Sequence, residues 1–486
     1  MVLEVVWALS LLYFAFTCAC YFQNDSHIQG ANTPVDGKSN SNNKPCNSET
    51  NIKQWHRCID SLTRWFDQEQ LETSARQCGF LRRKPRKITP LLFVQAAVLL
   101  VSQRAVSLSR WSALLGVIGG MSVAKQSLWQ RVNTHSVAFL EDILGRVIGE
   151  RLQGGERPVP EALKSFARVF IQDSTAIKLS AKLAAVFPGA RNHHGAKNGV
   201  LKLQAVYELV SQRFVHFSLS GFTRNDQAAA YDILSLLKPG ELVLRDLGYF
   251  VIGSFQQIAC CGAFFLSRFR LDSKVYDPRT GRELNLLGHL KRQGQMDQQV
   301  LLGRQRMAVR LVAVKLPEPV AAQRRRKARS NRDKRCHPKA RSLQLLGWSI
   351  FVTNVPSQRC SAKTIAQLYG LRWQIESLFK VWKSHFGLTQ VPRGSTDQLL
   401  VMIYARLVFI TVITQIIQMQ WLEQTDGQPA GSRFKLAAML SDYFLLLCLE
   451  AWGIRTSQLL LRQLTYHGRY DRRTRLNSAQ KLMKLS

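Results

Sequence analysis

No two of the ten cysteines in this 486-residue chain stand in a C-x2-C arrangement. A structural zinc site and a disulfide framework both rely on cysteines at regular, paired spacings, so neither is indicated. No internal repeat is evident along the chain, and a repeat architecture is therefore not indicated either. We interpret the cysteines as reduced thiols of an intracellular protein.

Acidic residues are scarce. The chain has 32 Asp and Glu against 67 Lys and Arg, which gives a formal net charge of +35 and a pI near 10.3. This balance implies an acidic partner, and nucleic acid is the first candidate because basic side chains displace counterions from phosphates. A basic structural or ribosome-associated protein would have a similar charge, so the charge indicates a class and no reaction. The length suggests two to four domains.

The segment Leu368–Phe386 has the apolar spacing of a helix, and Gly387 follows as a stop signal. A second stripe beside the apolar face carries polar side chains at the spacing Y-x2-R-x3-E-x6-K. A carboxylate between phenol, guanidinium and ammonium groups suits a metal-bound phosphate. The ordinary alternative is a solvated helix face with two cations and an anion. The four residues are Tyr369, Arg372, Glu376 and Lys383.

This spacing resembles the YREK signature of bacterial insertion-sequence transposases with an RNase H-like DDE catalytic domain. The resemblance covers roughly residues 87–464. It implies that Glu376 is the third metal-binding carboxylate, while Tyr369, Arg372 and Lys383 hold the DNA of the transposon end.

Two aspartates fit the same pattern. Asp173 follows the strand-like run 166–171 within FIQDSTAIKL, and Asp246 follows a strand within LVLRDLGYF. A single Asp at a strand end is more often a turn or cap residue. The family has its first Asp before Ser-Thr or Gly-Thr and its second before Gly-Tyr, as here. The resemblance therefore implies that Asp173, Asp246 and Glu376 are catalytic and bind two Mg²⁺ ions, for which Mn²⁺ can substitute.

The predicted fold is α/β, an RNase H-like catalytic core interrupted by a β-rich insertion domain, with a helical N-terminal DNA-binding region and a helical C-terminal region. The interval between Asp246 and Glu376 is too long for a bare core, which indicates the insertion. The predicted boundaries are an atypical apolar segment and linker at 1–51, N-terminal helices at 52–160, core at 161–267, insertion at 268–356, core with the signature helix at 357–395, and C-terminal helices with a basic tail at 396–486.

Within the predicted insertion, a run of basic residues has little to bury and is expected to form a mobile loop that follows the DNA backbone. It includes Arg324, Arg325 and Arg326. Trp348 falls in the last expected strand of the insertion. In related transposases a Trp in this part stacks on a flipped base, whereas a strand Trp is otherwise most often a core residue.

Between Leu108 and Asn133 we expect two helices separated by a Gly119-Gly120 turn, with Ser122 as a possible cap of the second. The pair is either a DNA-contacting element or part of an ordinary bundle.

Two apolar stretches raise the possibility of a membrane protein. Met1–Tyr21 could be a signal peptide or anchor, but it lacks a basic start, so a mis-assigned start codon or translated flanking DNA is preferred. Gln398–Leu422 could pass for a membrane span, but a core helix is preferred because it directly follows the signature helix. No membrane partner is expected, and the expected location is the bacterial cytoplasm, at the nucleoid.

The expected function is cut-and-paste DNA transposition, with cleavage at the inverted-repeat ends and insertion into target DNA by metal-dependent phosphoryl transfer. Two ends must be brought together, so a homodimer on double-stranded DNA is expected. One alternative is an RNase H-type nuclease without strand transfer. Another is a catalytically inactive transposase relic that only binds DNA, and a third is a membrane protein.

Overall fold

The computed structural model describes residues 66–103, 106–121, 123–150, 159–190, 198–330, 338–392, 394–422 and 433–451. The predictions for residues 1–51 and for the basic tail lie outside these residues. So do Ser122 and the basic positions beyond Ser330 in the predicted loop.

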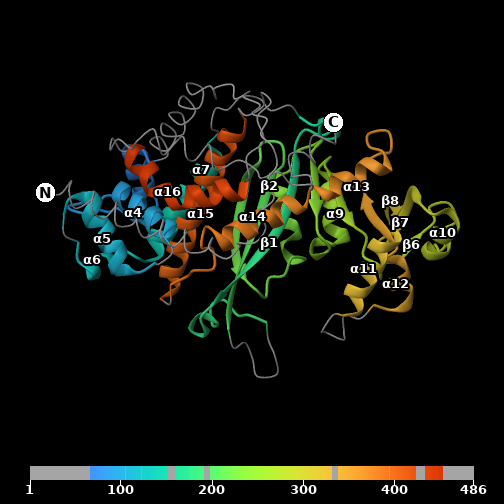
Figure 1. The fold of residues 1–486 in the computed structure, drawn as a ribbon, viewed down its shortest axis with the longest axis horizontal. Coiled ribbons are helices and arrows are strands. Elements are labelled where there is room, and N and C mark those ends of the chain that lie inside the picture. The colour runs from blue at the N-terminus through green and yellow to red at the C-terminus, as the bar shows by residue number, and fades with distance from the viewer. Residues whose placement is uncertain are drawn as a thin grey trace, which may run out of the picture. The chain divides into compact units, whose positions relative to one another are not determined.

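A nine-stranded sheet forms the centre of the described protein, in the order β3-β2-β1-β4-β5-β9-β8-β7-β6 (Figure 1). β1, β2 and β3 are antiparallel neighbours, and β4 and β5 run parallel to β1. The strands of this half are β1 (Val169–Leu179), β2 (Gly199–Glu208), β3 (Arg213–Gly221), β4 (Leu242–Arg245) and β5 (Phe264–Arg268).

The strands of the predicted insertion continue the same sheet. β9 pairs antiparallel with β5 on one side and with β8 on the other, so the hydrogen-bonded ladder is unbroken between the two halves. The elements here are β6 (Val275–Tyr276), α10 (Leu286–Gln293), β7 (Met296–Leu302), β8 (Met307–Lys315), α11 (Glu318–Arg329), α12 (Ala340–Leu345) and β9 (Trp348–Thr353).

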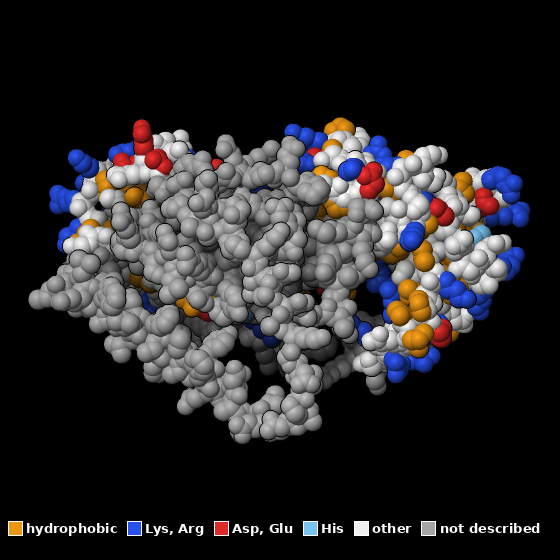
Figure 2. Space-filling model, turned by 45° about the horizontal axis from the view of Figure 1, so that its top comes forward, with side chains coloured by type: hydrophobic (Ala, Val, Ile, Leu, Met, Phe, Trp, Pro, Cys, Tyr) orange, Lys and Arg blue, Asp and Glu red, His pale blue; other side chains and the backbone are white. Residues whose placement is uncertain are grey.

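The prediction of a mobile basic loop is wrong for the residues that the structure describes, because Arg324–Arg326 belong to helix α11. Ala, Gln, Arg and Lys are good helix formers, and Pro319 stands in the first turn, where its missing N–H costs nothing. Ala321 is fully buried, so one face of the helix packs against the protein. Figure 2 shows Lys and Arg side chains spread over the described surface on the right, the side of the insertion.

Helices also precede the sheet, as predicted. α4 (Pro90–Ser102) starts at Thr89, whose side chain accepts a hydrogen bond from the N–H of Leu92. The second helix of the predicted pair is shorter than expected, since α6 covers only Lys125–Trp129 and begins after Ala124. The other helices are α3 (Gln68–Gln77), α5 (Leu108–Gly119), α7 (Thr134–Gly149) and α8 (Glu161–Lys164).

Between β3 and β5 the helices are short. A helix is expected over 225–237, and the structure has 3₁₀-helix there instead of α-helix, η2 (Ala228–Leu236). η3 (Leu247–Tyr249) and α9 (Ile252–Cys260) follow β4.

The C-terminal helices are α13 (Ala362–Gly370), α14 (Trp373–Ser384), α15 (Thr396–Leu422) and α16 (Arg433–Ala451). In the described residues, Thr396–Ile416 is long and apolar enough to cross a membrane, yet 94% of its most apolar window is buried inside the protein. It packs against α4, α7, α16 and β3. The prediction that this stretch is a core helix is confirmed.

Candidate active site

The carboxyl edge of the parallel strands brings the two predicted aspartates together. The last paired residues of the β1–β4 ladder are Gln172 and Arg245. Asp173 and Asp246 directly follow them, so the two carboxylates leave neighbouring strands at the same level. The prediction that Asp173 ends its strand is wrong, because antiparallel pairing with β2 carries β1 on to Leu179.

The expectation of one continuous helix over Leu368–Phe386 is also wrong. Between α13 and α14 the N–H of Arg372 donates to the carbonyl of Tyr369, three residues back instead of four. Gly370, a poor helix former, lies at this tighter turn. Side chains three residues apart eclipse each other in such a turn, so Tyr369 and Arg372 stay on one side despite the break.

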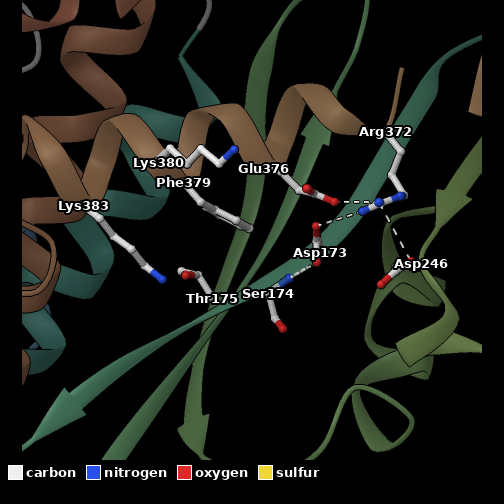
Figure 3. Close-up of a pocket in the computed structure, with 9 residues that line it drawn as sticks. All are labelled: Asp173, Ser174, Thr175, Asp246, Arg372, Glu376, Phe379, Lys380 and Lys383. Atoms are coloured by element: carbon white, nitrogen blue, oxygen red, sulfur yellow. Dashed lines mark hydrogen bonds and ion pairs between the residues drawn. The ribbon is translucent and has the colours of Figure 1, made fainter. Parts of the chain in front are cut away.

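The Arg372 guanidinium stands among three carboxylates (Figure 3). Its nitrogens lie 2.6 Å from Oε1 of Glu376, 3.4 Å from Oδ2 of Asp173 and 3.9 Å from Oδ1 of Asp246. The three acids come from α14, β1 and the start of η3, which are far apart in the sequence. The structure thus gathers the three predicted acids around a single positive charge, which leaves the cluster short of cations.

The environment of Asp173 disfavours its charged form. Burial raises the pKa of this carboxyl to about 7, and the neighbouring Asp246 and Glu376 add to the rise. The backbone N–H of Ser174, which donates to Oδ1 at 2.8 Å, and the Arg372 guanidinium act in the opposite direction. A carboxylate held this way gains from an added cation.

A pocket of about 310 Å³ opens beside the acids. Lys380 and Lys383 reach it from α14, and burial lowers the pKa of Lys383. The pocket therefore has an acidic end and a basic side, an arrangement that can hold a phosphate near cation-binding oxygens. Lys380 was not predicted, although its position one turn after Glu376 is the signal that could have identified it. The lining residues are Asp173, Ser174, Thr175, Asp246, Arg372, Glu376, Phe379, Lys380 and Lys383.

Tyr369 is buried, whereas the sequence suggested an open stripe. Its ring packs on Phe351 with 5.1 Å between centroids. Burial raises the pKa of its hydroxyl to about 12, and the charges of Arg372 and Arg268 act against that rise. Arg268 ends β5 at the same sheet edge, and sequence reasoning missed it because only the sheet register brings it to the site.

The predicted DNA-binding residues of the insertion have protein partners. The indole N–H of Trp348 donates to the carbonyl of Gly294 at 2.7 Å, and the side chain is half-buried against the insertion core. Arg324 donates to Oγ of Ser349 at 3.2 Å, and Arg325 pairs with Glu318 at 2.6 Å. Arg326 is exposed.

Another tryptophan, which was not predicted, is far more exposed. Trp373 opens α14 next to Arg372 and is 58% exposed. The Arg372 guanidinium carbon lies 5.7 Å from the centre of the indole ring. A large apolar side chain left open beside a charged site is available for contact with a ligand.

The donor set suits a hard divalent cation, because three carboxylates supply only oxygen ligands. In the described residues no three His, Cys, Asp or Glu side chains are closed up into metal-ligand geometry. The three carboxylates are instead spread around the guanidinium of Arg372. The three carboxylates therefore suit such an ion in ligand type and in charge, and the Arg372 guanidinium lies between them.

The sequence matches a family model and curated relatives. A model of the family "Transposase DDE domain" matches residues 164–411. The transposase for insertion sequence element IS231F of Bacillus thuringiensis subsp. israelensis is 27% identical over 413 residues, which cover 80% of this chain and 86% of that protein. The transposase for IS1151 of Clostridium perfringens is 26% identical over 382 residues, covering 74% and 80%. A solved piggyBac transposase synaptic complex with hairpin DNA is similar with a TM-score of 0.40 and 8% identity, over 89% of this chain and 87% of that one.

Proposed function

This chain belongs to the DDE transposases of insertion sequences, and we propose that it cuts and joins DNA at the carboxylates that surround Arg372. We assign the half-sheet β3-β2-β1-β4-β5 as an RNase H-like core. The support is its topology, with three antiparallel strands followed by two strands parallel to the first.

One observation carries the assignment of the site. Asp173, Asp246 and Glu376 belong to three separate elements, yet all three lie within 4 Å of the same guanidinium. Partly buried acids repel one another, and a fold keeps such a group together chiefly where it binds cations. The family match spans all three residues.

Asp173, Asp246 and Glu376 would hold two Mg²⁺ ions, with Mn²⁺ as a substitute, and these ions would supply the charge that in-line displacement at phosphorus requires. For these carboxylates to bind an ion, Arg372 has to release at least one of them. The freed guanidinium can then fork onto a phosphate, while Lys380 and Lys383 offer point charges along the pocket. Tyr369 keeps its proton near neutral pH and serves as a hydrogen-bond donor, with no covalent role.

The partner is double-stranded DNA, namely the inverted-repeat ends of the element and the target. The net charge of +35 and the exposed basic face of α11 support this partner. Since two ends react together, the active species would be a homodimer on DNA, acting at the nucleoid in the bacterial cytoplasm. The pair α5–α6 is the candidate for sequence contact, because most side chains of α6 are exposed.

The test is cleavage of a supercoiled plasmid that carries the inverted-repeat ends, with Mg²⁺ or Mn²⁺, comparing the wild-type protein with Glu376→Gln. We expect cuts at the repeat boundary from the wild type and none from the variant, since the amide cannot replace a charged ligand. Glu283→Gln is the matched control, because Glu283 forms an ordinary exposed pair with Lys274 at 2.7 Å.

The same assay separates the alternatives. Equal cutting by the wild type and Glu376→Gln would overturn the site assignment. DNA binding without cuts from either the wild type or the variants would indicate an inactive DNA-binding relic. Cuts without joining of the freed 3′ ends to target DNA would indicate a nuclease without strand transfer.

A further inference from the structure

A second carboxylate lies behind the first catalytic aspartate. Oδ1 of Asp226 accepts hydrogen bonds from Nζ of Lys202 at 2.7 Å, Oγ of Ser174 at 2.8 Å and Nε2 of Gln204 at 3.2 Å. Successive side chains of a strand point to opposite faces, so Ser174 directs these contacts away from the face that carries Asp173. Asp226 is therefore outside the acidic cluster and has its own cation.

The second aspartate motif reaches the same carboxylate. Gly248 lies close against Asp226, because a β-carbon added to this glycine would lie 3.0 Å from Oδ2 and 3.2 Å from Cβ of Asp226. The fully buried Tyr249 donates its hydroxyl hydrogen bond to Oε1 of Gln204. The residues after Asp173 and after Asp246 are thus joined through Asp226 and Gln204.

The backbone alone does not fix the distance between the two catalytic aspartates. The β1–β4 ladder ends at Gln172 and Arg245, and Asp246 stands at the start of a 3₁₀ turn. Beyond the last pair of a ladder, neighbouring strands are free to diverge. Ser174 and Gln204, by contrast, face each other directly across β1 and β2, which makes them a rigid base for a contact to the turn.

We propose that Asp226 is a positioning residue that sets the spacing of Asp173 and Asp246, and with it the affinity for the divalent cation. The proposal rests on the assignment of Asp173 and Asp246 as cation ligands. Polar groups that hold metal ligands in place typically contribute about 10- to 100-fold to metal affinity. The alternative is that Asp226 only neutralises the buried Lys202.

The test measures Mn²⁺ binding to the full chain without DNA, by the loss of the free Mn²⁺ electron paramagnetic resonance signal. We expect Asp226→Asn to weaken binding by about 10-fold or more. Asp232→Asn is the matched control, because Asp232 belongs to the same region and pairs with Arg224 at 2.7 Å without touching either motif. This control should bind Mn²⁺ like the wild type.

Two further variants separate positioning from charge balance. The double variant Lys202→Gln, Asp226→Asn removes the unpaired lysine, so wild-type affinity in this protein would overturn the proposal. Ser174→Ala keeps the ion pair of Asp226 with Lys202 and should still weaken Mn²⁺ binding, with an unchanged melting temperature. It keeps the test valid if Asp226→Asn does not fold.

The outcomes also distinguish this proposal from the site assignment on which it rests. Wild-type affinity in both Asp226→Asn and Ser174→Ala would overturn the positioning role alone. A wild-type protein that binds no Mn²⁺, or binds it equally well after Asp173→Asn, would overturn the assignment of the cation site itself.

Discussion

Two buried arginines, Arg310 on β8 and Arg372 before α14, contact carboxylates in different ways. In the insertion half, Arg310 forms a fork with Asp297, with N–O distances of 2.6 and 2.7 Å, and donates to the carbonyls of Val355 and Cys360. At the catalytic edge, Arg372 approaches three carboxylates, and only the contact with Glu376 is close. Its Nε has no hydrogen-bond partner among the described residues.

The contacts of Arg310 are those of a structural ion pair, whereas the contacts of Arg372 are those expected at a binding site. The donors of Arg310 are matched by one carboxylate and by backbone carbonyls, so the group is satisfied as it stands. It also links the segment before α13 to β8. Three carboxylates surround the single positive charge of Arg372. The carboxylates can therefore accept a cation, and the guanidinium can then accept a phosphate.

The largest expected effect on folding is therefore at Arg310. Arg310→Met removes the donor to the buried carbonyls of Val355 and Cys360, while the partly exposed Asp297 stays hydrated, and it should lower the free energy of unfolding by about 1–3 kcal/mol. Urea denaturation measures this loss. Arg310→Lys is the control that keeps the positive charge but loses the forked hydrogen bonds. Its free energy of unfolding should lie between those of the wild type and Arg310→Met. A loss below about 1 kcal/mol would mean that the pair is not the structural contact described above.

Arg372→Met should show the reverse pattern. Removal of a donor that stabilises transition-state charge typically costs about 10²- to 10³-fold in rate, and we expect a loss of that order in single-turnover DNA cleavage. The melting temperature should change little, because Glu376 and Asp246 are partly exposed and Asp173 can take up a proton. If Arg372→Met lost as much free energy of unfolding as Arg310→Met, the two arginines would not differ in role.

The sequence predicted the acids but not their supports. Asp173, Asp246 and Glu376 each follow a recognisable local pattern, and the structure brings them together. The break at Gly370 was missed because the apolar periodicity continues across it. Helix α11 was missed because its charge was weighed above the helix propensity of its residues and the burial of Ala321.

Contacts set by the register of the sheet gave no sequence signal at all. Asp226 lies near the start of 225–237, where a helix was expected, and no local pattern there marks a functional residue. Only the pairing of β1 with β2 brings Ser174, Gln204 and Lys202 to it. Arg268 reaches the site for the same reason, through the alignment of β5 with β4.

Two tryptophans, one in the insertion and one beside Arg372, extend the comparison. Trp348 uses its indole N–H inside the insertion, whereas Trp373 is open beside Arg372. If an extruded base is stacked at this edge, Trp373→Ala should lose about 1–3 kcal/mol of transition-state stabilisation in DNA cleavage without a loss of fold stability. Trp348→Ala should chiefly destabilise the fold. Fluorescence of a 2-aminopurine base near the cleavage site reports the stacking, and an unchanged signal in Trp373→Ala would exclude this residue.

A further prediction concerns pH and two aspartates, Asp173 on β1 and Asp226, which contacts the other face of that strand. Asp173 has a pKa of about 7 in the folded state, above its ordinary value, because it is buried. The folded protein therefore holds a proton that the unfolded chain loses near pH 4, so the free energy of unfolding should fall as pH rises from about 4 to about 7, by at most roughly 1.4 kcal/mol per unit.

Urea denaturation in the presence of a chelator measures this slope, and Asp173→Asn should remove it. The pKa of Asp226 is shifted the other way. Burial acts to raise it, but hydrogen bonds from Lys202, Ser174 and Gln204 outweigh burial and hold it below the ordinary value. Its contribution is therefore present above about pH 4 and is lost only as pH falls further. Asp226→Asn should leave the slope between pH 4 and 7 in place. If Asp173→Asn and Asp226→Asn changed the slope equally, the two carboxylates would not have different environments.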